Sequence, residues 1–224
     1  MRAFVVAGSP VAQKPIRLAP GPADRVIAAD YGAHHVLAWG WPLHLLIGDL
    51  DSLPAADLEA IQAMGIPMVT APAAKDETDL ELALMHALDG GARELVICAA
   101  LGGRADHMLA NVLLLARPEL ADASAAIVEA GQTVRLLRGG VSAAGETAHL
   151  TVVGAAGDLL TLLPLAGDAR GVTTAGLLYP LSDEPLLFGR ARGISNVLSA
   201  SVAQIWLREG LLLVIHTSQA LEAS

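Results

Sequence analysis

The chain is poor in cysteine and aromatic residues and has no long apolar run. Its single cysteine, Cys98, excludes a disulfide within the chain, and the apolar segment around it predicts a small buried side chain rather than a nucleophile. Aromatic residues make up 3% of the 224 residues and hydrophobic residues 54%, so we expect a core of alanine, leucine and valine. No stretch approaches the ~18 apolar residues of a membrane helix, and residues 1–6 resemble a strand rather than a signal peptide. These absences predict a soluble, cytoplasmic protein that does not enter a membrane.

Charged residues are also scarce, at 17%, where about a quarter is usual. Such a composition argues against a disordered chain. The net charge of −9 argues against a nucleic-acid groove, because phosphate backbones bind to positive surfaces. The acidic balance does not exclude a nucleotide, because ATP arrives with Mg²⁺ screening its phosphates.

The first 130 residues alternate short apolar runs with segments of helical apolar spacing. The runs predict buried strands at 3–7, 25–29, 43–47, 66–70, 94–99 and 125–129. The spacing predicts helices at 32–39, 55–64, 79–88 and 106–116. Because strand–helix alternation gives a parallel sheet with helices on its faces, we expect a Rossmann-like α/β domain over residues 1–130.

Residues 131–224 have a different pattern, in which short strand candidates are separated by glycine-rich turns. The predicted strands are 133–138, 148–153, 158–163, 185–188, 200–206 and 211–216, with no convincing amphipathic helix among them. Strands at this spacing are typical of a β-sandwich, so the second domain is expected to be all-β. The turn at 208–210 is expected to join the last two strands as a hairpin.

Five aspartates stand where apolar runs break into a loop or a helix start: Asp30, Asp49, Asp51, Asp79 and Asp106. Loops at the carboxyl ends of parallel strands meet at one rim, so acids far apart in the sequence can line a single cleft. Such a cluster is costly unless a cation neutralises it, and hard oxygen ligands suit Mg²⁺. The pattern points to metal-assisted phosphate chemistry.

These aspartates also have structural interpretations. In an extended chain Asp49 and Asp51 project to the same side, roughly 6.5–7 Å apart, where they could hold metal. They could equally form a turn with an Asx motif. Asp79 starts a helix with a capping box between Thr78 and Glu81, and the helix dipole favours an acid there in any case.

A second group of residues could contact phosphate. The segment Gly102-Gly103-Arg104 follows a strand and precedes a helix, so its backbone could approach an anion while Arg104 adds positive charge. Its spacing matches neither a Walker loop nor the dinucleotide-binding fingerprint. His107 is either part of this group or a simple helix-start residue, and Lys75 either faces a phosphate or is a solvated surface charge. Ser9, after the first strand, has no identifiable base and is not expected to be a nucleophile.

Taken together and in order, these segments resemble the thiamine pyrophosphokinase family. Each matching stretch is short, but their order and spacing make the resemblance specific. It extends from about residue 26 to the end of the chain. The stretches are 29–33, 47–52, 75–79, 101–107, 171–181, 188–189 and 193–196.

The resemblance implies an amino-terminal ATP-binding domain, a carboxyl-terminal sandwich that binds thiamine, and a homodimer. It implies that a pyrophosphoryl group moves from ATP to the hydroxyl of thiamine, releasing AMP. On the matching positions it implies Mg²⁺ ligands at Asp49, Asp51 and Asp79. The acidic site would be completed by Asp30 and Asp106. Contacts to the ATP phosphates are implied for Lys75, Thr78, Arg104 and His107, and contacts to thiamine for Ser195 and Asn196.

Two positions depart from the family pattern. Tyr31 stands where the family usually has glycine, and it would be strained if that position needs a positive φ. No aromatic residue follows Asn196 to stack on thiamine, although Tyr179, Trp206 or Tyr31 could substitute. The second departure leaves open an acceptor that is another hydroxymethyl heterocycle, such as a pterin. A module that binds its ligand without catalysis is a further alternative, against which the five retained carboxylates argue.

Overall fold

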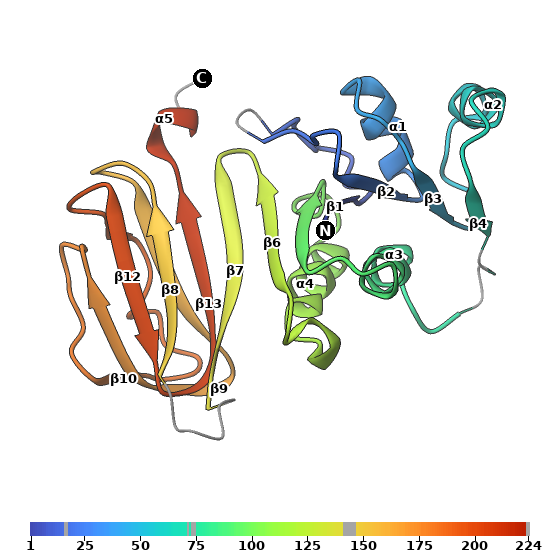
Figure 1. Cartoon of the computed structure of the whole chain (residues 1–224). Coiled ribbons are helices and arrows are strands. Elements are labelled where there is room, and N and C mark those ends of the chain that lie inside the picture. The colour runs from blue at the N-terminus through green and yellow to red at the C-terminus, as the bar shows by residue number, and fades with distance from the viewer. Residues whose placement is uncertain (16–17, 71, 73–74, 141–146, 223–224) are drawn as a thin grey trace. The chain divides into compact units, whose positions relative to one another are not determined.

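Strands that alternate with helices build the first of two units, residues 1–130 (Figure 1). The computed structural model describes residues 1–15, 18–70, 72, 75–140 and 147–222. In the first unit six strands pair in parallel, in the order β4-β3-β2-β1-β5-β6. Their bounds are β1 Arg2–Val6, β2 Arg25–Ala29, β3 Leu45–Gly48, β4 Met68–Thr70, β5 Glu94–Cys98 and β6 Ser124–Glu129.

Helices cover both faces of this sheet, with α1 and α2 on one side and α3 and α4 on the other (Figure 1). Alternate residues of a strand point to opposite faces, and Phe4, Val26 and Leu46 share a core cluster with residues of α1 and α2. The expected fold class is confirmed, and in this unit the helix and strand ends lie within two residues of the predicted ones. The helices are α1 Gly32–Ala38, α2 Ala55–Ala63, α3 Asp79–Asp89 and α4 Ala105–Leu114, followed by the 3-10 turn η1 Pro118–Leu120.

The interior of the first unit is mostly aliphatic, with Phe4 and Trp41 among its buried residues, and it excludes water from Cys98, which is fully buried on β5. Burial raises the pKa of the Cys98 thiol to about 12, so the side chain is neutral and packs as a small hydrophobe. This is the predicted role. In the part of the chain that the structure describes, no helix combines the length and apolarity needed to span a bilayer.

The second unit, residues 131–224, is antiparallel. In one sheet β13 lies between β7 and the first part of β9, and that part of β9 also pairs with β11. In the other sheet β12 lies between β8 and the last part of β9. Leu160, Ile205 and Leu212 from the two sheets share one buried cluster, as in a sandwich. The bounds are β7 Gln132–Gly139, β8 Ala148–Val153, β9 Leu159–Ala175, β10 Glu184–Leu186, β11 Asn196–Val197, β12 Val202–Leu207, β13 Glu209–Thr217 and helix α5 Gln219–Glu222.

Strand β9 is the main departure from the predicted strands of this unit. It was expected to end at residue 163 but runs to Ala175, because Ala166 and Gly167, with φ of 61° and 141°, let it bend from one sheet into the other. The hairpin predicted at 208–210 is wrong. β12 and β13 pair with different parts of β9, so the chain changes sheets at this turn.

Candidate active site

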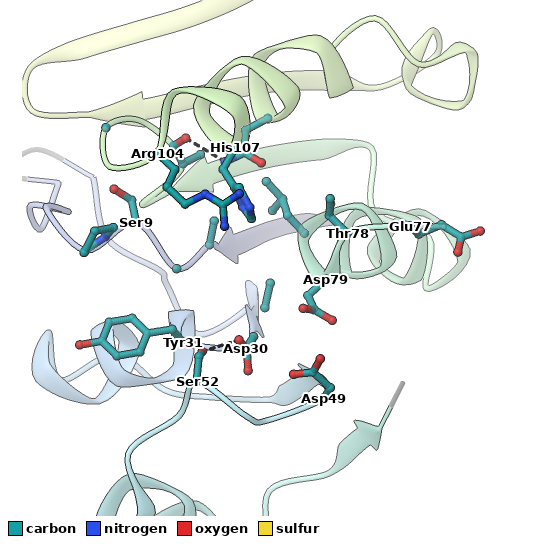
Figure 2. Close-up of a pocket in the computed structure, with 18 of the residues that line it drawn as sticks. Ser9, Asp30, Tyr31, Asp49, Ser52, Glu77, Thr78, Asp79, Arg104 and His107 are labelled. Atoms are coloured by element: carbon teal, nitrogen blue, oxygen red, sulfur yellow. Dashed lines mark hydrogen bonds between the residues drawn. The ribbon is translucent and has the colours of Figure 1, made fainter. Parts of the chain in front are cut away.

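A cleft of about 470 Å³ opens at the carboxyl ends of β1, β2, β3 and β5 in the first unit. This is the rim at which ligands bind in open parallel sheets. Its walls come from loops that are far apart in the sequence (Figure 2). The lining residues include most of the predicted site residues of this unit: Asp30, Asp49, Lys75, Thr78, Asp79, Arg104 and His107.

Three carboxylates converge in this cleft. Asp30 follows β2, Asp49 follows β3 and Asp79 begins α3, and one oxygen of each lies within 4.8 Å of the others. Figure 2 shows the three side chains facing one another. All three are partly buried, so their mutual repulsion is only incompletely screened by water. This arrangement favours a bound cation.

Asp30 is the most constrained of the three. Its backbone has a φ of 48°, a left-handed conformation that aspartate tolerates, and its Oδ2 accepts a hydrogen bond from the Ser52 hydroxyl. Its Oδ1 is buried and has no hydrogen-bond partner among the described residues. Burial, together with the negative charges of Asp79 and Asp49, raises the pKa of Asp30 above its ordinary value. A buried oxygen left without a donor indicates that an external group completes the site.

Asp51 does not join the three converging carboxylates. The expected same-side projection of Asp49 and Asp51 fails because β3 ends at Gly48 and Leu50 has a φ of 66°, which turns the chain. The Asp51 amide instead donates to Asp49 Oδ1 at 3.2 Å, which is an Asx turn. The Asp51 side chain is exposed, and the Asp49 charge raises its pKa.

Two cations line the cleft, each paired with a carboxylate. Lys75 Nζ lies 2.6 Å from Asp79 Oδ1, and only 12% of its side chain is exposed. Arg104 forms a bidentate pair with Asp106, at 2.6 and 3.2 Å, on the exposed start of α4. The Arg104 guanidinium lowers the pKa of Asp106 to about 2. Arg104 lines the cleft, whereas Asp106 lies outside the acidic group.

Thr78 fixes the start of α3 and therefore the position of Asp79. Its side-chain oxygen accepts from the Glu81 amide at 3.2 Å, as the capping prediction requires. The Glu81 carboxylate pairs with Arg117, so the reciprocal half of the capping box has a different partner. The N-cap thus places Asp79 in the first turn, pointing into the cleft (Figure 2).

The loop after β1 is a wall of the cleft that sequence reasoning did not assign to the site. Gly8, Ser9 and Pro10 line it, and the Ser9 hydroxyl donates to the Leu101 carbonyl at 2.6 Å. The sequence could have indicated this loop by its position, because it also follows a parallel strand in the centre of the sheet. Other lining residues outside the predicted set are Tyr31, Ser52, Glu77 and Asn111.

The glycine loop packs tightly against this wall. Gly102 and Gly103 have φ of 81° and 69°, and a Cβ on Gly102 would lie 2.5 Å from Val11 Cγ2. Beneath the loop, Glu129 is buried and accepts the Leu101 amide at 2.8 Å. Burial raises the pKa of Glu129, and amide hydrogen bonds partly offset that effect. The loop is therefore held from both sides, which positions Arg104.

The predicted thiamine contacts lie in the second unit. Ser195 has a φ of 58°, and its amide donates to Thr161 Oγ1 at 3.0 Å. The Asn196 side chain accepts a hydrogen bond from the Tyr179 amide at 3.1 Å and donates one to the Tyr179 carbonyl at 2.7 Å. The Tyr179 side chain is 70% exposed, so these bonds hold a solvent-facing aromatic residue beside Asn196.

Two family models match the chain. Residues 21–128 match the catalytic domain of thiamin pyrophosphokinase, and residues 149–212 match its vitamin B1 binding domain. The chain belongs to the thiamin pyrophosphokinase family. It is therefore an enzyme, a transferase, as the resemblance implied. The converging acids, Lys75 and Arg104 all lie within the matched catalytic segment.

Individual family members are similar to this chain in sequence and fold over most of their length. The chain is 26% identical to thiamine pyrophosphokinase of Bacillus subtilis over 171 residues, which are 76% of this chain and 77% of that protein. It superimposes on thiamin pyrophosphokinase of Geobacillus thermodenitrificans with a TM-score of 0.81 and 28% identity, covering 98% and 99% of the two chains. For the thiamin pyrophosphokinase family protein of Enterococcus faecalis the TM-score is 0.83, the identity 26% and the coverage 98% and 100%.

Proposed function

We propose that this enzyme transfers the terminal diphosphoryl group of Mg-ATP to the hydroxyl of thiamine, giving thiamine diphosphate and AMP. The observation that supports this most directly is the cleft of the first unit. There, Asp30, which has one uncompensated oxygen, converges with two further carboxylates, and Lys75 and Arg104 line the same cleft. Phosphoryl-type transfer needs alignment and charge neutralisation more than a strong nucleophile, and this cleft offers both.

The donor set fits magnesium. Asp30, Asp49 and Asp79 supply hard oxygen ligands from three separate loops, and the buried Asp30 Oδ1 has no partner among the described residues. When bound, Mg²⁺ would neutralise phosphate charge and polarise the phosphorus that is attacked. The predicted ligand Asp51 is adjacent to this group, so its contribution would be smaller.

Positive groups of the chain would orient the phosphates. Lys75 is held against Asp79 and lines the cleft, where it would contact a phosphate oxygen. Arg104 lies on the opposite wall at the start of α4, where backbone amides also favour an anion. Thr78 and His107 line the same space and would add hydrogen bonds.

The acceptor is assigned to the second unit, in which the vitamin B1 binding model matches. We assign the missing aromatic contact to Tyr179, because Asn196 fixes its backbone and its ring is solvent-facing. Trp206 is less suited, because its ring already stacks on His149 with centroids 5.0 Å apart. Ser195 would then contact thiamine directly, and Asn196 would act by holding Tyr179.

In the reaction, the hydroxyl oxygen of thiamine forms a bond to the β-phosphorus of ATP. The bond from that phosphorus to the oxygen bridging to the α-phosphorus breaks, and that oxygen leaves on AMP. The hydroxyl proton is lost to a base or to water. The same cleft residues hold the donor phosphates in line throughout.

Product analysis tests this proposal. Purified enzyme with Mg-ATP and thiamine should yield thiamine diphosphate and AMP in equal amounts, as resolved by phosphorus NMR or chromatography. Formation of ADP and thiamine monophosphate would overturn it. A hydroxymethyl pterin should be offered in parallel, because the alternative acceptor requires it to be used in preference to thiamine. The family matches do not favour that alternative.

The homodimer implied by the family resemblance stays a prediction. Light scattering on the eluting enzyme would test it, with a mass of twice 23.0 kDa as the expected result.

A further inference from the structure

Tyr31 brings a phenol ring to a cleft whose other lining residues are mostly polar or small, apart from Pro10 and Leu80. It precedes α1 with a φ of −56° and a ψ of −17°, so replacing the usual glycine causes no backbone strain. Its side chain makes no capping bond and lines the cleft. In Figure 2 the ring projects to the other side of Asp30 from Asp49 and Asp79.

The ring is held by neighbours that are themselves fixed. The His34 ring lies 5.0 Å from it and the His35 ring 5.3 Å, the latter edge-on. His34 Nδ1 bonds Asp57 Oδ2 at 2.7 Å, and His35 Nε2 donates to the Ser9 carbonyl at 2.8 Å. Tyr31 is therefore preorganised, and a ligand that stacks on it loses little side-chain freedom.

The opposite loop is shaped to admit this residue. A Cβ on Gly8 would lie only 3.0 Å from Tyr31 Cβ, closer than ordinary van der Waals contact. Gly8 therefore provides the space that the larger residue needs. Gly8 and Tyr31 both line the cleft, so the ring starts from its wall and extends on the side away from Asp49 and Asp79 (Figure 2).

We infer that Tyr31 is a specificity residue whose ring stacks on the purine base of the nucleotide donor. This rests on the proposed function. Phosphate and base belong to one molecule, and the groups suited to phosphate, Lys75 and Arg104, line the same cleft as Tyr31. The acceptor has its own exposed aromatic residue, Tyr179, in the unit that matches the vitamin B1 binding model. The two tyrosines should therefore serve different substrates.

The test compares Tyr31→Ala, Tyr31→Phe and Tyr179→Ala with the wild-type enzyme. The dissociation constants of Mg-ATP and of Mg-tripolyphosphate, which lacks the base, are measured by calorimetry. We expect Tyr31→Ala to weaken Mg-ATP roughly tenfold, which corresponds to about 1.4 kcal/mol, because stacking on an aromatic ring is lost. Its affinity for tripolyphosphate should stay within about twofold, and Tyr31→Phe should bind both ligands like the wild type, because it keeps the ring.

Steady-state kinetics add a crossed comparison. Tyr31→Ala should raise KM for ATP and leave KM for thiamine nearly unchanged, and Tyr179→Ala should do the reverse. Equal weakening of ATP and tripolyphosphate by Tyr31→Ala would overturn the inference, because it would indicate a distorted cleft. A rise in KM for thiamine alone would also overturn it, because the ring would then serve the acceptor.

The outcomes separate this inference from the proposed function. If the wild type makes thiamine diphosphate and AMP but Tyr31→Ala binds Mg-ATP normally, only the role of Tyr31 is wrong. If the wild type makes neither product yet its ATP affinity depends on Tyr31, the proposed reaction is wrong and the base contact stands.

Discussion

Asp30 in the first unit and Asp158 in the second are both shielded from water, yet their environments are opposite. Asp158 is 4% exposed, and its oxygens accept from His216 Nε2 and the Ala155 amide at 2.9 Å and the Gln219 amide at 3.1 Å. Asp30 has one donor, Ser52, and a buried oxygen with no described partner. Burial acts to raise both pKa values, but the hydrogen bonds of Asp158 outweigh it and lower the pKa, whereas that of Asp30 is raised.

The difference separates a carboxylate whose bonds are complete within the fold from one that we propose to be functional. Asp158 holds the turn before β9 and the start of α5 to β13, and its bonds are complete within the fold. Asp30 sits among like charges, an arrangement that costs stability unless a ligand supplies the missing positive charge. The parallel sheet produces this situation because its strand ends gather loops at one rim. In the sandwich, by contrast, Asp158 stabilises turns between its strands.

The largest effect is expected from breaking the acidic cluster. Asp49→Ala should lower the rate of thiamine diphosphate formation by about a thousandfold, because a metal ligand contributes several kcal/mol to the transition state. The free energy of unfolding should stay the same or rise, because one of three mutually repelling charges is removed. Initial rates and thermal unfolding measure both quantities.

Asp51→Ala is the matched control for this prediction, since it removes a neighbouring but exposed carboxylate. Its loss of rate should be much smaller than that of Asp49→Ala. Equal losses would mean that Asp51 also holds the metal when substrate is bound.

Replacing Asp158 should lower stability, in contrast to replacing Asp49. Asp158→Asn should lower the free energy of unfolding by about 2 kcal/mol at neutral pH, because buried donors lose a charged acceptor. Its pKa is lower in the folded state than the unfolded value of about 3.9, so the stabilisation is complete above that value. It should disappear as the pH falls through the folded pKa. Urea unfolding at several pH values tests this, and a difference that stays constant down to low pH would contradict it.

A smaller effect is expected from removing the N-cap of α3, the helix that begins with Asp79. Thr78→Ala removes the N-cap of α3 and should lower the free energy of unfolding by about 1 kcal/mol. Thr78→Ser keeps the oxygen and should recover most of that loss. If the two variants are equally stable, the cap does not position Asp79.

Much of this arrangement could be predicted from the sequence. The apolar runs located the strands, and the strand-end rule brought Asp30, Asp49 and Asp79 to one rim. Asp51 was predicted as a metal ligand, but Asp30 is the third converging carboxylate instead. This could not be foreseen, because Asp51 is turned away by a left-handed φ at Leu50, and residue type alone does not specify that conformation. The path of β9 could not be predicted either, because a bend between two sheets depends on which sheet edges are unpaired once the sheets have packed.

Metal binding at the three converging carboxylates tests the central claim most directly. Mn²⁺ would be titrated by electron paramagnetic resonance, with an ATP analogue that cannot be cleaved between its α- and β-phosphates. Wild type and Asp158→Asn should bind Mn²⁺ equally well, and Asp30→Asn should bind it at least tenfold more weakly, a loss of about 1.4 kcal/mol. If Asp30→Asn binds Mn²⁺ as tightly as the wild type, the uncompensated oxygen of Asp30 is not a metal ligand and the account of the cleft is wrong.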